Sequence, residues 1–220
     1  MRGKLIVFEG IEGSGKTTQI KQLHQWLEQL LERSLSDYPT GVIVTRQPGG
    51  TYLGQKIRQI LLDPSPDTGS LTSKSELLLY AADRAHHVAQ ILMPALKTGH
   101  LVLCDRYTAS TVAYQGYGRQ LDLNLIKTLN TIATGGLTSD LTLWLKLDVA
   151  AGLKRIGSRG ETDRIEQAGL EFHRRVHQGF VAQAKQQERF VTVDGSLEQA
   201  AVTEQIKAIL STYMQQWYGI

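Results

Sequence analysis

The chain has 220 residues, 41% of them hydrophobic, which suits one folded domain over residues 1–220 with a sizeable core. Its 24 basic and 21 acidic side chains give a formal net charge of +3 without a basic run, which disfavours nucleic acid and membrane surfaces as partners. The single cysteine, Cys104, excludes an internal disulfide framework; with no membrane-length apolar stretch and no signal peptide, we expect a cytoplasmic protein.

Short apolar runs alternate with stretches of helical periodicity along the whole chain. The runs predict five strands: KLIVFEG near residue 4, GVIVTR from Gly41, HLVLCDR from His100, LTLWLKLD from Leu141 and RFVTVDG from Arg189. Helices are predicted over Lys16–Arg33, Tyr52–Leu62, Ser73–Lys97, Leu123–Thr134, Val149–Ile156, Asp163–Glu188 and Leu197–Gln215. This alternation is typical of an α/β fold in which a five-stranded parallel sheet carries helices on both faces.

The first predicted strand leads into a glycine-rich loop, FEGIEGSGKTT, from Phe8 to Thr18. Its spacing matches G-x-x-x-x-G-K-[ST], in which backbone N–H groups and a lysine bind phosphates and a hydroxyl binds Mg²⁺. An accidental glycine turn is the alternative, but the strand before the loop and the helix after it favour a P-loop NTPase fold. The predicted triphosphate contacts are Gly10, Ile11, Glu12, Gly13, Ser14, Gly15, Lys16, Thr17 and Thr18.

Charged residues follow two other predicted strands. Asp105 comes directly after the run LVLC, so we expect it near Mg²⁺ together with Thr17, although an ordinary turn acid is the alternative. Arg46 and Arg106 also stand at strand ends. Because ligands of such sheets bind beyond the carboxyl ends of the strands, this pair of arginines indicates a second phosphate, separate from the triphosphate.

Five blocks of the sequence together resemble the thymidylate kinase family. FEGIEGSGKTT, TRQPGGT, LLLYAADRAHHV, DRYTASTVAYQGYGR and LKLDVAAGLKRIGSRGETDRIEQ occur in that family's order and approximate spacing. The resemblance implies that the γ-phosphoryl group of MgATP passes to dTMP, giving dTDP and ADP, and that the chain forms a homodimer.

Two other functions stay open on the sequence. Another small P-loop nucleotide or nucleoside kinase would share the loop, but Arg46 with Arg106 favours a phosphorylated acceptor. A nucleotide-dependent switch protein would share it too, yet the sequence lacks the N-K-x-D motif that reads guanine.

The resemblance also assigns a dTMP site. Tyr80 would stack on thymine, with core packing as the alternative, and Arg84 on the same helix face would donate to a base carbonyl. Tyr114 would fill the space of a ribose 2′-hydroxyl. The remaining assignments are Glu12 near the 3′-hydroxyl, Arg46 and Arg106 on the monophosphate, Ser110 and Thr111 beside the base, and Glu166 on the sugar side.

Residues 151–166 resemble the family's mobile lid. The variable P-loop positions 11–14 hold no arginine, so the resemblance implies that Arg155, Arg159 or Arg164 supplies a catalytic cation in addition to Lys16. A solvated helix face is the alternative, because acidic residues are interleaved with these arginines.

One position departs from the family. Gln47 stands where the bacterial pattern usually has glutamate, which puts in doubt a charge-dependent role in orienting Arg46 or tuning the metal environment. His173 and His177 lie four residues apart without a third ligand, so we expect a solvated pair rather than a zinc site.

Overall fold

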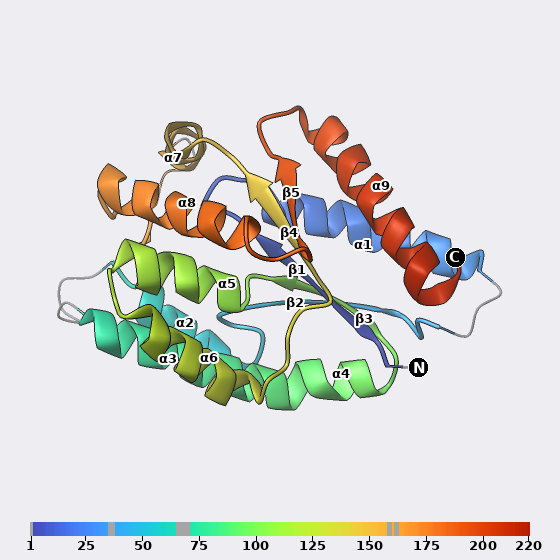
Figure 1. Ribbon diagram of the computed structural model, residues 1–220, viewed down its shortest axis with the longest axis horizontal. Coiled ribbons are helices and arrows are strands. Elements are labelled where there is room, and N and C mark those ends of the chain that lie inside the picture. The colour runs from blue at the N-terminus through green and yellow to red at the C-terminus, as the bar shows by residue number, and fades with distance from the viewer. Residues whose placement is uncertain (1, 35–37, 65–70, 158–159, 161–162) are drawn as a thin grey trace.

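The computed structural model describes residues 2–34, 38–64, 71–157, 160 and 163–220, which form a central sheet with helices on both sides (Figure 1). The strands are β1 (Lys4–Glu9), β2 (Val42–Arg46), β3 (Leu101–Asp105), β4 (Leu141–Lys146) and β5 (Phe190–Asp194). They lie in the order β2-β3-β1-β4-β5, and neighbouring strands are parallel. The predicted five-stranded parallel sheet is confirmed.

Helices connect the strands. They are α1 (Lys16–Glu32), α2 (Tyr52–Leu62), α3 (Ser73–His87), α4 (Met93–Lys97), α5 (Thr108–Thr111), α6 (Leu123–Thr134), α7 (Val149–Gly157), α8 (Leu170–Ala184) and α9 (Gln199–Tyr218), with π-helical segments η2 (Val88–Leu92) and η3 (Val112–Gly118). Across the ranges that the structure describes, no helix combines the length and apolarity needed to cross a membrane.

Two helix predictions need correction, and one helical segment was missed. The stretch predicted as one helix over Ser73–Lys97 widens into η2 just before Pro94, which has no N–H to continue the α-helical ladder. The helix predicted from Asp163 begins only at Leu170, because the Asp163 carboxylate accepts the N–H groups of Ile165 and Glu166 at 2.8 and 2.9 Å and holds a turn. The helical segment 108–118 was not predicted, since its β-branched residues and glycines have low helix propensity.

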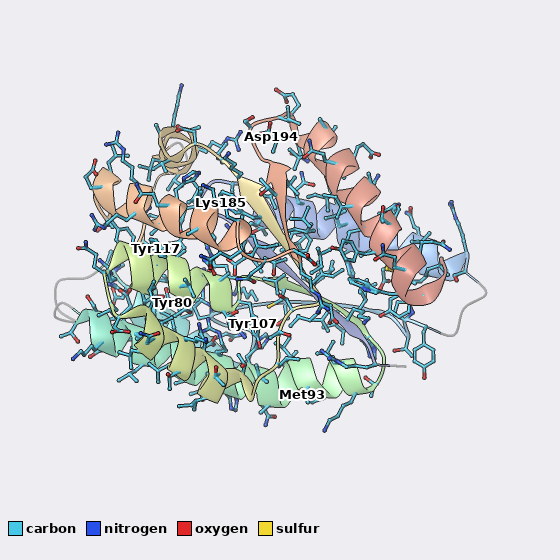
Figure 2. The ribbon with its side chains drawn as sticks, in the orientation of Figure 1. Tyr80, Met93, Tyr107, Tyr117, Lys185 and Asp194 are labelled. Carbon is cyan, nitrogen blue, oxygen red and sulfur yellow. The ribbon has the colours of Figure 1, made fainter. Side chains whose placement is uncertain are left out.

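Side chains alternate between the two faces of the sheet and so make two cores. Ile6 and Phe8 of β1 face α1 and α9, whereas Leu5 and Val7 face η2 and α4. Tyr107, just after β3, packs with this second group (Figure 2). A third cluster joins Trp144 of β4 to η3, α7 and α8. The prediction of helices on both faces is therefore confirmed.

The carboxyl ends of three adjacent strands meet at one edge of the sheet. In the strand register Asp105 pairs with Phe8 on one side and with Arg46 on the other. The glycine-rich loop after β1 is thereby placed beside the polar residues that follow β2 and β3.

A fully buried carboxylate, that of Glu76 on α3, ties this end of the molecule together. Gln115 donates to it at 2.8 Å, Arg119 at 3.2 and 3.0 Å, and the Arg164 guanidinium lies 2.7 Å away. Burial by itself would raise the pKa of Glu76, but the hydrogen bonds from Arg119 and Gln115 and the charge of Arg164 hold it below its ordinary value of 4.5. Glu76 thus fastens η3 and the residues after α7 to α3.

We expect Glu76→Gln to lower the free energy of unfolding near neutral pH by about 2–3 kcal/mol, because two arginines lose a buried carboxylate. Since the folded-state pKa is depressed, this contribution is complete above the ordinary pKa of 4.5 and is lost as the pH falls further. Urea titrations of the parent and the variant across this range should therefore converge in acid. Glu188→Gln, at an exposed position, is the control, and a gap that stays constant with pH would contradict the assignment.

Candidate active site

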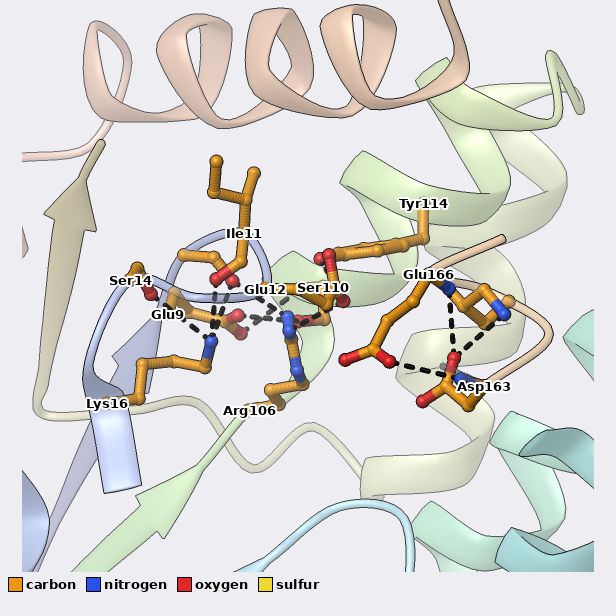
Figure 3. Close-up of polar contacts among 12 residues, drawn as sticks. Glu9, Ile11, Glu12, Ser14, Lys16, Arg106, Ser110, Tyr114, Asp163 and Glu166 are labelled. Atoms are coloured by element: carbon orange, nitrogen blue, oxygen red, sulfur yellow. Dashed lines mark hydrogen bonds and ion pairs between the residues drawn. The ribbon is translucent and has the colours of Figure 1, made fainter. Parts of the chain in front are cut away.

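The loop between β1 and α1 closes around the ammonium group of Lys16 (Figure 3). Lys16 donates to the carbonyl oxygens of Gly10 and Ile11, each at 3.0 Å, and lies 3.3 Å from the Ser14 hydroxyl. These acceptors are uncharged, while burial and the neighbouring Arg106 lower the pKa of Lys16 to about 8. Because its hydrogen-bond acceptors carry no charge, the buried ammonium group would be stabilised most by an anion that enters the loop.

Oxygen ligands suited to Mg²⁺ lie beside the loop. The Thr17 hydroxyl is 3.4 Å from Oδ2 of Asp105, and Oδ1 of Asp105 is buried without a hydrogen-bond partner among the described residues. A hydroxyl and a carboxylate are donors that Mg²⁺ prefers, and the free oxygen of Asp105 is one that a cation would satisfy. The residues predicted for the metal therefore fit it.

The carboxylate of Glu12 is the junction between the loop and two other elements. Its Oε1 accepts from Nη2 of Arg106 at 2.9 Å and from the Tyr114 hydroxyl at 2.6 Å. Burial would raise the pKa of Glu12, but the charges of Arg106 and Lys16 lower it below the ordinary value. Oε2 is buried without a hydrogen-bond partner among the described residues, so one acceptor position stays available.

Arg106 is held from several sides. It also donates to the Gly10 carbonyl at 2.9 Å and to the Ser110 hydroxyl at 3.1 Å, and it lies over the Tyr114 ring at 5.0 Å. Burial works against its charge, but Tyr114, Glu12 and the other nearby acids raise the pKa of Arg106 above its ordinary value. The guanidinium is therefore permanently charged and has a fixed orientation.

Glu9, which sequence reasoning did not single out, orders the start of α5. Its Oε1 accepts the N–H groups of Tyr107 and Ser110 at 2.9 and 3.1 Å, and its Oε2 accepts from the Ser110 hydroxyl at 2.6 Å. The signal was available in the sequence, because Glu9 is an acid at the end of an otherwise apolar strand run.

Arg84 is more deeply buried than its predicted role suggested, with 2% of its surface exposed. It donates to Gln47 Oε1 at 2.9 Å, to Asn130 Oδ1 at 2.7 Å and to the Tyr107 carbonyl at 3.1 Å. Gln47 therefore contacts Arg84. The sequence instead suggested a role for this position in orienting Arg46. His173 is also buried, so the expected solvated pair is wrong for that residue; its Nδ1 lies 3.9 Å from Glu12 Oε2.

A cavity of about 480 Å³ opens over this edge of the sheet. Fifteen of the predicted site residues line it: Glu12, Gly13, Gly15, Lys16, Thr17, Thr18, Arg46, Tyr80, Arg84, Asp105, Arg106, Ser110, Thr111, Tyr114 and Glu166. Gly10, Ile11 and Ser14 are not part of its lining, but they bond to Lys16 or Arg106. Sequence reasoning missed Arg58, Gln115 and Asp163 in the lining.

The three lid arginines have different positions. Arg155 of α7 donates to the Gly13 carbonyl at 3.2 Å, next to the loop. Arg164 forms an ion pair with Glu76 and donates to the Leu61 carbonyl at 2.9 Å. Arg159 lies outside the described residues.

A family model, curated relatives and a solved structure that are similar to this chain are all described as thymidylate kinase. A family model described as thymidylate kinase matches residues 8–206. Thymidylate kinase of Trichodesmium erythraeum is 52% identical, covering 99% of each chain, and that of a Cyanothece species is 54% identical, covering 99% of this chain and 97% of its own. The crystal structure of thymidylate kinase from Ehrlichia chaffeensis superposes with a TM-score of 0.76 at 31% identity, covering 96% of this chain and 100% of that one. The P-loop NTPase fold is thereby confirmed.

Close packing of α7 on the loop generates a prediction. A Cβ atom on Gly152 would lie 2.7 Å from the Glu12 carbonyl oxygen and 2.9 Å from the Ile11 side chain. We expect Gly152→Ala to push α7 away from the loop and to weaken ATP binding, measured by calorimetry, about tenfold or more. Gly157→Ala is the matched control, because a Cβ there meets nothing within 4 Å. Equal ATP affinities of the two variants would show that the contact is unimportant.

Proposed function

Because the chain belongs to the thymidylate kinase family, we propose that its cavity holds dTMP beside the triphosphate of ATP for direct phosphoryl transfer. The chain is a phosphotransferase of nucleotide biosynthesis, and it phosphorylates dTMP with ATP. The observation that carries the proposed site is the Glu12–Arg106 ion pair of 2.9 Å, which joins the P-loop to the opposite side of the same cavity.

On the ATP side, the P-loop backbone and Lys16 bind the β- and γ-phosphates, with residues 10–18 as the contact segment. Thr17 and Asp105 would hold Mg²⁺, which when bound neutralises part of the phosphate charge. The proposal is supported by the unpartnered carboxylate oxygen of Asp105 and by the uncharged acceptors that surround the Lys16 ammonium.

On the acceptor side, Arg46 and Arg106 grip the dTMP phosphate. Tyr80, Arg84, Ser110 and Thr111 surround the base, and Tyr114 occupies the 2′ side of the sugar. Glu12 and Glu166 accept hydrogen bonds from the sugar. Support comes from the cavity, which all nine residues line, and from the free Oε2 of Glu12.

The reaction is an in-line displacement that needs no covalent enzyme intermediate. An oxygen of the dTMP phosphate bonds to the γ-phosphorus while the bond from the γ-phosphorus to the bridging oxygen breaks, and ADP leaves. Lys16 stabilises the charge on the transferring group, and residues 151–166 act as a lid that supplies Arg155 as a second cation. Arg155 is favoured over Arg164 because it already contacts Gly13, whereas Arg164 pairs with Glu76.

We further propose a homodimer that works in the cytoplasm. Helices α2 and α6 each pack against α3, and the three helices expose large apolar side chains. They include Leu53, Ile60, Leu78, Leu125 and Ile132, the last with 71% of its surface exposed. A second copy covering this face would remove that apolar surface from water.

We expect Lys16→Ala to fold normally and to lower kcat about 10²-fold or more, the effect of losing a fixed cation beside developing charge. ADP release with dTMP as acceptor measures the loss. Lys21→Ala, on the exposed face of α1, should keep parental turnover. Near-parental turnover in a folded Lys16 variant would overturn the proposed ATP site.

Arg155→Ala should lower kcat about 10²-fold while changing the KM for dTMP less than about threefold, because its cation acts on the transferring group alone. Lys154→Ala, at the neighbouring exposed position, is the control. Arg164→Ala should mainly lower stability, since Glu76 loses a partner. If the Arg155 variant keeps kcat within about threefold, the lid cation does not come from this residue.

A further inference from the structure

A chain of buried polar contacts runs from β2 to α3 behind the cavity. The Thr45 hydroxyl lies 2.6 Å from Nε2 of His87, and Nδ1 of His87 lies 2.8 Å from Nε2 of Gln47. Gln47 Oε1 in turn accepts from Nε of Arg84 at 2.9 Å. Gln47 and His87 are buried, and Arg84 and Gln47 line the cavity. The proposed reaction does not use Gln47 or His87.

The hydrogen bonds in this series can run in only one direction, from donor to acceptor. Arginine can only donate, so the amide oxygen of Gln47 must face Arg84 and its NH₂ group must face His87. Nδ1 of His87 is then the acceptor, and the ring hydrogen sits on Nε2, where it is donated to Thr45. Burial, reinforced by the charges of Arg84 and His86, lowers the pKa of His87 to about 4, which agrees with a neutral ring.

The partners of Arg84 are uncharged as well. Besides Gln47, it donates to the amide oxygen of Asn130 and to the carbonyl of Tyr107. The adjacent acid, Asp83, accepts the Gly49 N–H at 3.0 Å. Arg84 thus has a fixed orientation that comes from uncharged acceptors, without a hydrogen bond to a carboxylate among the described residues.

The turn that carries Gln47 is shaped to fit His87. A Cβ atom on Gly50 would lie 2.5 Å from Nε2 of His87. The imidazole therefore occupies the space that any other side chain at position 50 would need. The turn therefore meets α3 at two points: Gly50 packs closely on His87, and the Gly49 N–H donates to Asp83.

We propose that Gln47 and His87 are positioning residues for Arg84: as a neutral, one-directional series of hydrogen bonds they aim its guanidinium into the cavity. The occupant, dTMP, rests on the proposed function. The direction of the hydrogen bonds and the position of the ring hydrogen on His87 do not depend on the proposed function.

The first test needs no substitution. Nitrogen-15 NMR of the ligand-free parent, with His87 assigned by its loss in His87→Gln, should show one neutral tautomer near neutral pH, with hydrogen on Nε2. Hydrogen on Nδ1 would overturn the proposal even if dTMP is the substrate. The expected tautomer combined with no turnover of dTMP would instead count against the proposed function.

The second test compares two substitutions of one residue. Gln47→Met keeps the size of the side chain and removes both hydrogen bonds, so the KM for dTMP should rise about fivefold or more while the KM for ATP changes less. Gln47→Glu keeps the acceptor for Arg84, so its KM for dTMP should stay within about fivefold of the parent, but NMR should show that His87 now carries hydrogen on Nδ1.

Gln55→Met, at an exposed position of α2, controls for the chemistry of the substitution and should behave as the parent. A KM for dTMP within about fivefold in Gln47→Met, or equal losses for dTMP and ATP, would overturn the positioning role. If Gln47→Met does not fold, the tautomer of His87 in the parent and the behaviour of Gln47→Glu still test the proposal.

Discussion

The structure depends on one ion pair, that between Glu12 and Arg106, whose nearest atoms are 2.9 Å apart. It joins the loop after β1 to the residue after β3, and the hydroxyl of Tyr114 brings η3 to the same carboxylate oxygen. Arg106 adopts a left-handed backbone conformation with φ of 71°, which is strained for a residue with a side chain. The bonds of its guanidinium to Gly10, Glu12 and Ser110 offset that strain and hold the loop after β1 against the residues that follow β3.

The cavity gathers positive charge that the protein itself does not fully neutralise. Lys16, Arg46, Arg58, Arg84 and Arg106 all line it, and burial together with the nearby charge of Arg46 lowers the pKa of Arg58. The carboxylates of Glu12, Asp105, Asp163 and Glu166 line it as well, so they offset the repulsion among the five cations only in part until another anion enters. Two phosphorylated substrates relieve this repulsion, so electrostatics favour the complex of both over the empty site. Glu12, Asp105 and Glu166 place acceptors where hydroxyl groups or a metal ion can meet them.

Much of this architecture could be predicted because it is local. Each apolar run became a strand, and the P-loop spacing alone located Lys16 and Thr17 at the start of a helix beside the cavity. Helix 108–118 could not be predicted, because its stability comes from packing against α8 and from the Glu9 carboxylate, far away in sequence. The contacts of Arg84 with Gln47 and Asn130, and the ion pair of Arg164 with Glu76, could not be predicted either, because they also join residues far apart in sequence. Periodicity shows which face of a helix is apolar, but it does not show which polar groups will meet across the fold.

The central claim is that Glu12, although it belongs to the ATP-binding loop, serves the acceptor. Calorimetric titration of Glu12→Gln with dTMP and, separately, with ATP tests it most directly. The account predicts that the Kd for dTMP rises about tenfold or more, or ~1.4 kcal/mol, because Arg106 loses the carboxylate that fixes its orientation and the sugar of dTMP loses a hydrogen-bond acceptor. The Kd for ATP should change less than about threefold. Equal losses for both nucleotides, or unchanged dTMP binding, would contradict it.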